Sequence, residues 1–324
     1  MNVLLISDNN YAYLLGGCLY SLFKSNEAIR EINVFIISDN ISKESIEKIR
    51  SIGDEFKRNI IFLDPPKMND KIIVKGSLNI STYYRLMLTS VIPKETEKIL
   101  YLDCDILVRG SLNELWNTDI SNSLLAGVYD TTGTYARTAI GLSKDDIYVN
   151  AGVLLINLKK WRQDRIEDRF LQYLGNMNWE VEFNDQGVIN RICANQTKLL
   201  NPKYNFMPTY DRYTWHELKR IVNSENFYKE IDIKDSKTNP IIVHFAGYAF
   251  SRPWFENVET TYSTEYTACL NETGISFELK KQPSGIKYRI RKIVDKFPNP
   301  LCLVANKLID RMYVMTGIPN KLNK

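Results

Sequence analysis

The sequence predicts an α/β fold with a mostly parallel central sheet whose two faces are covered by helices. Three apolar runs of strand length lie near the N-terminus, at residues 3–6, 34–37 and 60–63. Stretches with apolar residues at helical spacing separate them, at residues 11–22 and 42–52. Strands that alternate with helices in this way are typical of βαβ units and of a parallel sheet buried on both faces.

Single residues refine the helical elements. Gly16 and Gly17 lie within the first helical stretch, where their missing side chains would allow a neighbour to pack closely. Ser42 precedes the second helical stretch and is expected to cap its N-terminus. Residues 81–88 are also helical in character and contain Arg85, for which a solvated helix face is the alternative position.

The most informative stretch is residues 98–108, KILYLDCDILV, in which an apolar strand ends in two aspartates. Asp103 and Asp105 are two residues apart, so both side chains point to the same face of an extended backbone. Two buried carboxylates repel each other and are costly to desolvate. A divalent cation such as Mg²⁺ or Mn²⁺ would stabilise them. The alternative is a solvated strand end or a helix cap.

Polar residues also flank other predicted strands. Asp8 and Asn10 follow the first strand, and the carboxyl ends of parallel strands share one cleft. Residues 150–152, Asn-Ala-Gly, lead into a strand at residues 153–156. The small residues would let a ligand approach the backbone, and Asn150 offers both a donor and an acceptor. An ordinary turn before a core strand is the alternative.

Two later stretches supply further candidate site residues. Asp185 and Gln186 lie at the expected start of a helix. The alternative to a site role is that Asn184 or Asp185 is merely the N-cap of that helix. His244 follows the last expected strand, residues 241–243, and an imidazole suits Mn²⁺ beside carboxylates. The alternative for a lone histidine is a packing or hydrogen-bonding role.

The composition is that of an ordinary globular protein, with 44% hydrophobic and 25% charged residues. Five scattered cysteines without C-x-x-C spacing favour reduced thiols and a cytoplasmic location over a disulfide scaffold or a zinc site. We recognise neither a secretory leader nor a run of about 18 apolar residues that would span a membrane. Glycine-rich dinucleotide and P-loop motifs are absent.

The charge is unevenly distributed along the chain. Residues 280–324 contain 11 Lys/Arg and 2 Asp/Glu, a net charge of +9, whereas residues 1–279 carry −5 of the total of +4. Apolar residues recur at helical spacing in this basic region. They form a first set, Ile286, Ile290, Ile293, Val294 and Phe297, and after Pro298 and Pro300 a second set, Leu301, Val304, Leu308, Met312 and Met315.

Basic amphipathic helices of this kind suit an anionic membrane surface. Packing on the body of the protein or on a second subunit is the alternative. Charge alone would also permit nucleic-acid binding, but no recognition motif accompanies it, so we expect no nucleic-acid partner.

These residues together resemble glycosyltransferase family 8, which includes galactosyl- and glucosyltransferases related to bacterial lipopolysaccharide enzymes and to glycogenin. The resemblance runs from about Met1 to Trp254. It depends on five motifs in a fixed order, LISDNNY, YLDCDILV, YVNAGVLLINLKKW, FNDQGVIN and VHFAG.

The resemblance implies roles for individual positions. The metal ligands, with Mn²⁺ or Mg²⁺ as the cofactor, correspond to Asp103, Asp105 and His244. The residues that hold the uridine correspond to Asp8, Asn10 and Tyr11. A backbone contact to the diphosphate corresponds to Gly247. The positions that line the donor sugar correspond to Arg85, Asn150, Ala151, Gly152, Asp185 and Gln186.

The implied fold is of the GT-A type over residues 1–262, followed by a basic, largely helical region over residues 263–324. The implied reaction moves a hexose, glucose or galactose, from a UDP-sugar to a cell-surface glycan, a lipid-linked intermediate (glycolipid) or a glycoprotein, with retention of anomeric configuration. It would take place in the cytoplasm, with possible attachment to the inner face of the membrane. As a nucleophile, Asp185 is chemically better than the amide Gln186, whereas a front-face mechanism requires neither.

Two positions depart from the family pattern. Residues 248–251 lengthen the loop after Gly247, and Arg252 replaces the usual lysine, although arginine also pairs with a diphosphate. Gly187 follows Gln186, where an acidic residue is frequent.

Two other functions fit the paired aspartates. Phosphatases of the haloacid-dehalogenase type carry a similar pair, normally on an early strand. A non-catalytic nucleotide-sugar-binding protein is the second alternative.

Overall fold

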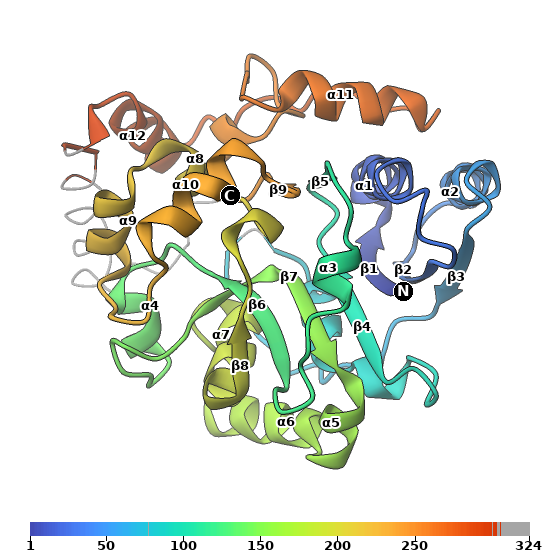
Figure 1. Cartoon of the computed structure of the whole chain (residues 1–324), viewed down its shortest axis with the longest axis horizontal. Helices are drawn as coiled ribbons and strands as arrows, with labels where there is room; N and C mark the ends of the chain where they lie inside the picture. The colour runs from blue at the N-terminus through green and yellow to red at the C-terminus, as the bar shows by residue number, and fades with distance from the viewer. Residues whose placement is uncertain (77, 300, 303–304, 306–324) are drawn as a thin grey trace.

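The structure is a computed structural model of the chain, and it describes all residues except 77, 300, 303–304 and 306–324. A seven-stranded sheet forms its centre (Figure 1). In spatial order the strands are β3 (Asn59–Leu63), β2 (Asn33–Asp39), β1 (Asn2–Asp8), β4 (Lys98–Leu102), β7 (Val149–Asn157), β6 (Leu125–Tyr129) and β8 (Thr197–Leu199).

The sheet is mostly parallel, as the sequence predicted, and only one of its seven strands is reversed. β1 pairs in parallel with β2 and β4, and β2 with β3. β7 is antiparallel to both of its neighbours, β4 and β6. Because of this reversal, the first residues of β7 lie at the edge where β4 ends.

A second, two-stranded sheet continues from the central strand. β5 (Ile106–Val108) follows β4 after three residues and pairs with β9 (Ile242–His244). The antiparallel register places His244 opposite Ile106. Residues 103–105 therefore bridge the two sheets, and a distant part of the chain is held against them.

Helices surround the central sheet (Figure 1). Ser42 caps α2 as predicted, since its hydroxyl accepts a hydrogen bond from Ser45 N. The helices are α1 (Ala12–Lys24), α2 (Lys43–Glu55), α3 (Asn113–Trp116), α4 (Thr134–Ala139), α5 (Leu158–Gln163), α6 (Ile166–Asn176), α7 (Asn184–Cys193), α8 (Pro208–Arg212), α9 (Trp215–Val222), α10 (Glu230–Thr238), α11 (Ser263–Glu272) and α12 (Ile286–Asp295).

The two adjacent glycines of α1 allow α11 and the segment after it to pack closely. A Cβ atom on Gly17 would lie 2.5 Å from Leu270 Cδ2, and one on Gly16 would lie 2.7 Å from Ile275 Cδ1. This confirms the close packing predicted for these glycines. The boundary expected at residue 262 stays a prediction.

The alternative considered for Arg85, a solvated helix face, is wrong, because Arg85 is buried in the 3₁₀ helix Ile80–Leu86. One expectation for the basic region needs correction. Val294 does not belong to the exposed apolar stripe of α12, because its side chain is buried while Ile286, Ile290 and Ile293 are exposed. Most of the second apolar set, from Val304 onward, lies outside the described residues. Within the described residues, every helix is too short or too polar to cross a bilayer.

Candidate active site

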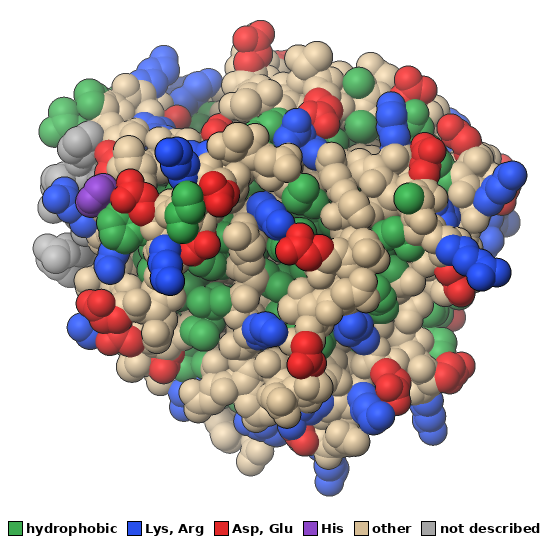
Figure 2. Space-filling model, viewed as in Figure 1, with side chains coloured by type: hydrophobic (Ala, Val, Ile, Leu, Met, Phe, Trp, Pro, Cys, Tyr) green, Lys and Arg blue, Asp and Glu red, His purple; other side chains and the backbone are tan. Residues whose placement is uncertain are grey.

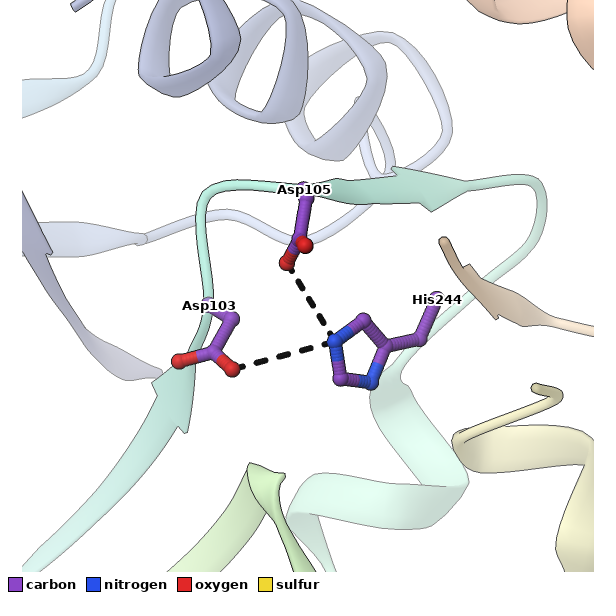
Figure 3. A group of neighbouring side chains, drawn as sticks. All are labelled: Asp103, Asp105 and His244. Atoms are coloured by element: carbon purple, nitrogen blue, oxygen red, sulfur yellow. Dashed lines mark ion pairs between the residues drawn. The ribbon is translucent and has the colours of Figure 1, made fainter. Parts of the chain in front are cut away.

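Asp103, Asp105 and His244 meet at the carboxyl edge of the central sheet (Figure 3). Asp103 directly follows β4, Asp105 directly precedes β5, and the β5–β9 register brings His244 beside them. The His244 Nε2 atom lies 3.2 Å from Asp105 Oδ1 and 3.7 Å from Asp103 Oδ2. One ligand atom from each residue lies within 4.8 Å of the others. Sequence-distant residues thus form one candidate metal centre.

A chain of hydrogen bonds defines which nitrogen of His244 faces the carboxylates. The backbone N–H of Gly152 donates to Asn150 Oδ1 at 3.0 Å, so that atom is an acceptor. Asn205 Nδ2 donates to the same oxygen at 2.9 Å, which leaves Asn205 Oδ1 against His244 Nδ1, also at 2.9 Å. An amide oxygen only accepts, so Nδ1 carries a proton and Nε2 points at the aspartates.

The pKa shifts of His244 and Asp105 indicate that this cluster favours a positive charge beside its carboxylates. Burial alone lowers the pKa of His244, but the Asp105 and Asp103 carboxylates outweigh burial and raise that pKa. Burial raises the pKa of Asp105, yet His244 and then Arg252 reverse this and lower it to about 2. A proton on His244 offsets the carboxylate charge, and a bound cation would do the same.

Gly152 makes room for the imidazole ring. A Cβ atom at this position would lie 2.2 Å from His244 Cε1 and 2.9 Å from Asp103 Oδ2. The turn considered for residues 150–152 is wrong, because these residues belong to β7. They reach the site because β7 is antiparallel and begins where β4 ends.

Arg85 connects the aspartates of two separate elements. Its guanidinium forms ion pairs with Asp103 Oδ1 at 3.0 Å and with Asp185 Oδ2 at 3.1 Å. It also donates to the carbonyl of Ala151 at 2.7 Å and lies 4.4 Å from the centre of the Tyr101 ring. Arg85 therefore holds the predicted sugar-lining residues together.

Asp185 occupies the first turn of α7, but neither Asn184 nor Asp185 is the N-cap. Phe183 holds that position with a φ of 63°, and its side chain makes no capping bond. Asn184 instead bonds the backbone of Lys75, accepting from its N–H and donating to its carbonyl. Burial raises the pKa of Asp185 to about 6, against the opposing effect of Arg85.

Gln186 is fixed by hydrogen bonds at both ends of its amide. Its Oε1 accepts from Ala151 N at 3.0 Å and from Asn150 Nδ2 at 3.3 Å. Its Nε2 donates to Asp130 Oδ2 and to Tyr148 Oη, both at 3.2 Å. The amide is thereby held in one orientation along the first residues of β7.

Among the residues of this network that sequence reasoning missed are Asp130 and Asn205. Asp130 directly follows β6, and the apolar run before it was an available signal of a strand that ends in a carboxylate. Asn205 lies in an irregular stretch with no comparable signal, although it is fully buried between Asn150 and His244.

The residues expected to hold the uridine lie at the end of β1. Asp8 Oδ1 accepts from the backbone N–H of Tyr11 at 3.1 Å and so begins the short helix that carries Asn10 and Tyr11. Asn10 is exposed and Tyr11 half-buried. These exposures place Asn10 at the surface near the end of β1 and Tyr11 partly in the interior.

The lengthened loop after β9 still returns to the cluster. Gly247 has a φ of +112°, a conformation that strains any residue with a side chain. Arg252 reaches to 3.9 Å from Asp105 Oδ2, and its Nε atom is buried without a hydrogen-bond partner in the described structure. The substituted arginine thus points into the site.

Comparison with known proteins decides the family. The family "Glycosyl transferase family 8" matches residues 2–258. The chain belongs to glycosyltransferase family 8. This membership excludes the phosphatase alternative, and it agrees with the order of motifs along the chain.

Individual relatives agree with the assignment. A putative glycosyltransferase of Haemophilus influenzae is 34% identical over 216 residues, which are 64% of this chain and 64% of that protein. The chain therefore spans just under two thirds of that relative. A lipopolysaccharide 1,2-glucosyltransferase of Escherichia coli is 26% identical over 255 residues, 77% of this chain and 71% of that protein.

A solved structure shares the fold. The crystal structure of the galactosyltransferase LgtC with donor and acceptor sugar analogues superimposes with a TM-score of 0.69 and 26% identity. The match covers 86% of this chain and 98% of that chain. The fold is therefore of the GT-A type, as the sequence predicted.

Proposed function

We propose that this glycosyltransferase moves glucose or galactose from a UDP-sugar to a hydroxyl of a glycan, with retention of configuration and with a bound divalent cation. The observation that carries the proposal is the convergence of Asp103, Asp105 and His244 beside Arg252. The names of the two relatives, a glucosyltransferase of lipopolysaccharide and a galactosyltransferase, support a hexose donor and a cell-surface glycan.

The residues present fit a metal ion. Two carboxylates and one imidazole nitrogen form a donor set that suits Mn²⁺, with Mg²⁺ as the alternative. Asn205 orients the imidazole toward the carboxylates, and Gly152 leaves space for the ring. When bound, the cation supplies Lewis-acid stabilisation of the charge that develops on the leaving diphosphate.

Arg252 and Gly247 would bind the diphosphate. The buried Nε of Arg252 is an unsatisfied donor, and a phosphate oxygen would satisfy it. The left-handed backbone at Gly247 leaves its surroundings open, since a Cβ atom there would meet only Ser251 Oγ, at 3.3 Å. Gly247 and Arg252 lie in the loop that follows β9. This loop ends at Trp254, whose side chain is buried in the core.

The network around Arg85 would hold the donor sugar. Hydrogen bonds and ion pairs already fix the side chains of this network, so these side chains lose little conformational freedom when the sugar binds. The Asp185 carboxylate forms an ion pair with Arg85. The Gln186 amide forms hydrogen bonds through both its oxygen and its nitrogen. Neither is free to attack the anomeric carbon, and this supports a front-face mechanism in which the leaving phosphate accepts the acceptor's proton.

An adjacent cavity of about 350 Å³ suits the acceptor. It begins at Asp130, Asn150 and Gly247, next to the donor-sugar residues, and extends to α8 and α12. Aromatic side chains and both signs of charge line its far part, a combination that suits a sugar's apolar faces and hydroxyl groups. Its lining there includes Arg212, Tyr213, Tyr248, Phe250, Arg291 and Asp295.

We further propose that α12 rests on an anionic membrane surface, which would favour a lipid-linked acceptor. Hydrophobic and basic side chains gather at the upper left of Figure 2, where Figure 1 places α12. Its apolar residues Ile286, Ile290 and Ile293 share one face of the helix, and Phe297 follows just after its end. Each of the four is at least 42% exposed.

Hydrolysis of UDP-glucose and UDP-galactose with Mn²⁺ tests the function directly. We expect slow release of one sugar by the wild-type protein, loss of activity in EDTA, and loss in Asp103→Asn and Asp105→Asn. Asp54→Asn, an exposed position on α2, is the matched control and should retain activity. Full activity in EDTA would contradict the metal centre. Binding of UDP without turnover of any UDP-sugar would favour the non-catalytic alternative.

A further inference from the structure

Lys280 lies at the rim of the donor site although it comes from beyond the region that matches the family, residues 2–258. Its N–H donates to the Trp254 carbonyl at 2.8 Å, and its own carbonyl accepts from Glu256 N at 2.9 Å. The backbone around Lys280 is therefore paired with the stretch that directly follows Arg252.

The segment that carries Lys280 is fixed to α1. Leu270 and Ile275 pack against the two glycines of α1, and the Phe277 ring stacks on Tyr13 with a centroid distance of 5.4 Å and an interplanar angle of 6°. Three contacts in succession thus guide the chain from α11 to the rim of the site. The position of Lys280 follows from packing.

The ammonium of Lys280 faces aromatic rings rather than a carboxylate. It lies 4.8 Å from the centre of the Tyr11 ring and 5.8 Å from that of Tyr13. Within the described residues, no carboxylate forms an ion pair with it. Burial lowers the pKa of Lys280, Asp8 opposes this, and Arg252 lowers it further. The charge of Arg252 therefore acts on Lys280, whose backbone is paired with Trp254 and Glu256 just after Arg252.

We propose that Lys280 binds the diphosphate of the donor together with Arg252. The assignment rests on the proposed function and extends it to a residue outside the family's matched region. Arg252 and Lys280 would together supply two positive charges beside the two negative charges of a UDP-sugar diphosphate.

The test compares UDP with uridine, which lacks the phosphates. Lys280→Met keeps the apolar stem and removes the charge, and Lys281→Met, at an exposed neighbouring position, is the matched control. By calorimetry we expect Lys280→Met to weaken UDP binding about tenfold, or about 1.4 kcal/mol, and to make it less dependent on salt. Uridine binding, followed by ligand-observed NMR, should not change, and Lys280→Arg should restore UDP affinity.

Each other outcome has a definite meaning. Unchanged UDP affinity in Lys280→Met would overturn the assignment, and so would an equal loss for UDP and uridine, which would assign Lys280 to the base. Tighter UDP binding would overturn it too, because Lys280 would then compete with the nucleotide for the Tyr11 ring. Failure of the wild-type protein to bind UDP would instead overturn the proposed function, and this assignment with it.

Discussion

Asp103 and Gly152 are joined across the β4–β7 ladder, where the N–H of Asp103 donates to the Gly152 carbonyl at 2.8 Å. Asp103 and Gly152 also border the space that the His244 ring occupies. A Cβ atom on Gly152 would clash with the side chains of His244 and Asp103. One backbone hydrogen bond thus sets the spacing of the candidate metal centre.

Gly152→Ala should therefore disrupt this centre. The added methyl group must displace His244, so we expect Mn²⁺ affinity to fall at least about tenfold and stability to fall by roughly 1–3 kcal/mol. Calorimetry with Mn²⁺ and urea unfolding would measure the two effects. Gly285→Ala is the control, since a Cβ atom there meets nothing within 4 Å. Wild-type Mn²⁺ affinity in Gly152→Ala would contradict the role of His244.

Asn205→Leu should weaken metal binding although it substitutes none of the three expected metal ligands. The substitution removes the acceptor for His244 Nδ1, so the imidazole loses its fixed orientation. Loss of such an outer partner lowers metal affinity by roughly 10–100-fold. The measurement is Mn²⁺ titration, with the exposed Asn117→Leu as control. An effect confined to thermal stability, with metal affinity intact, would assign Asn205 a packing role only.

The elevated pKa of Asp185, about 6, gives the protein a pH dependence with a defined sign. An unfolded aspartate titrates near 3.9, so between roughly pH 4 and 6 the folded state binds the additional proton. The contribution of Asp185 to stability therefore increases as the pH falls from about 6 to about 4. Wild-type protein should gain stability relative to Asp185→Asn when urea unfolding is moved from pH 7.5 to pH 5. A constant difference would contradict the shift.

The exposed stripe of α12 should govern membrane binding. A triple substitution of Ile286, Ile290 and Ile293 by serine removes side chains that are 75%, 44% and 59% exposed, so the fold should tolerate it. Burial of an isoleucine side chain contributes roughly 1.5–3 kcal/mol, and sedimentation with anionic vesicles should fall more than tenfold. Ile231→Ser, 55% exposed on α10, is the matched control. Equal sedimentation of the triple variant and wild type would exclude α12 as the contact.

The spacing of apolar residues predicted the βαβ half of the fold, because the buried faces of those strands and helices consist of local apolar runs. The strand at residues 3–6 and the helix over residues 11–22 appear almost where expected, since their patterns are uninterrupted. β6 was missed although residues 125–129 are fully buried, because alanine and glycine make its apolar run a weaker signal than the runs of the other strands. Its pairing with β7 stabilises β6 as a strand even though its own sequence pattern is weak.

The site was predictable where its residues follow strands and unpredictable where partners come from elsewhere. Asp103, Asp105 and His244 each stand next to an apolar strand, and the structure brings them together. The reversal of β7 was not predicted, and residues 150–152 were expected before the strand rather than within it, with an ordinary turn as the alternative. Asn205 and Lys280 stand in irregular segments, and only tertiary packing places them at the site.

The antiparallel ladder between β4 and β7 also determines which parts of the protein are free to diversify. Side chains alternate along a strand, so a slip of one residue would turn Asn150 and Gly152 toward the opposite face. The connection between β6 and β7 lies outside this ladder, and both of its ends, Asp130 and Tyr148, are held by hydrogen bonds from Gln186. Insertions there would reshape the proposed acceptor cavity, which Asp130 and Thr131 line, while Asp103, Asp105 and His244 keep their alignment.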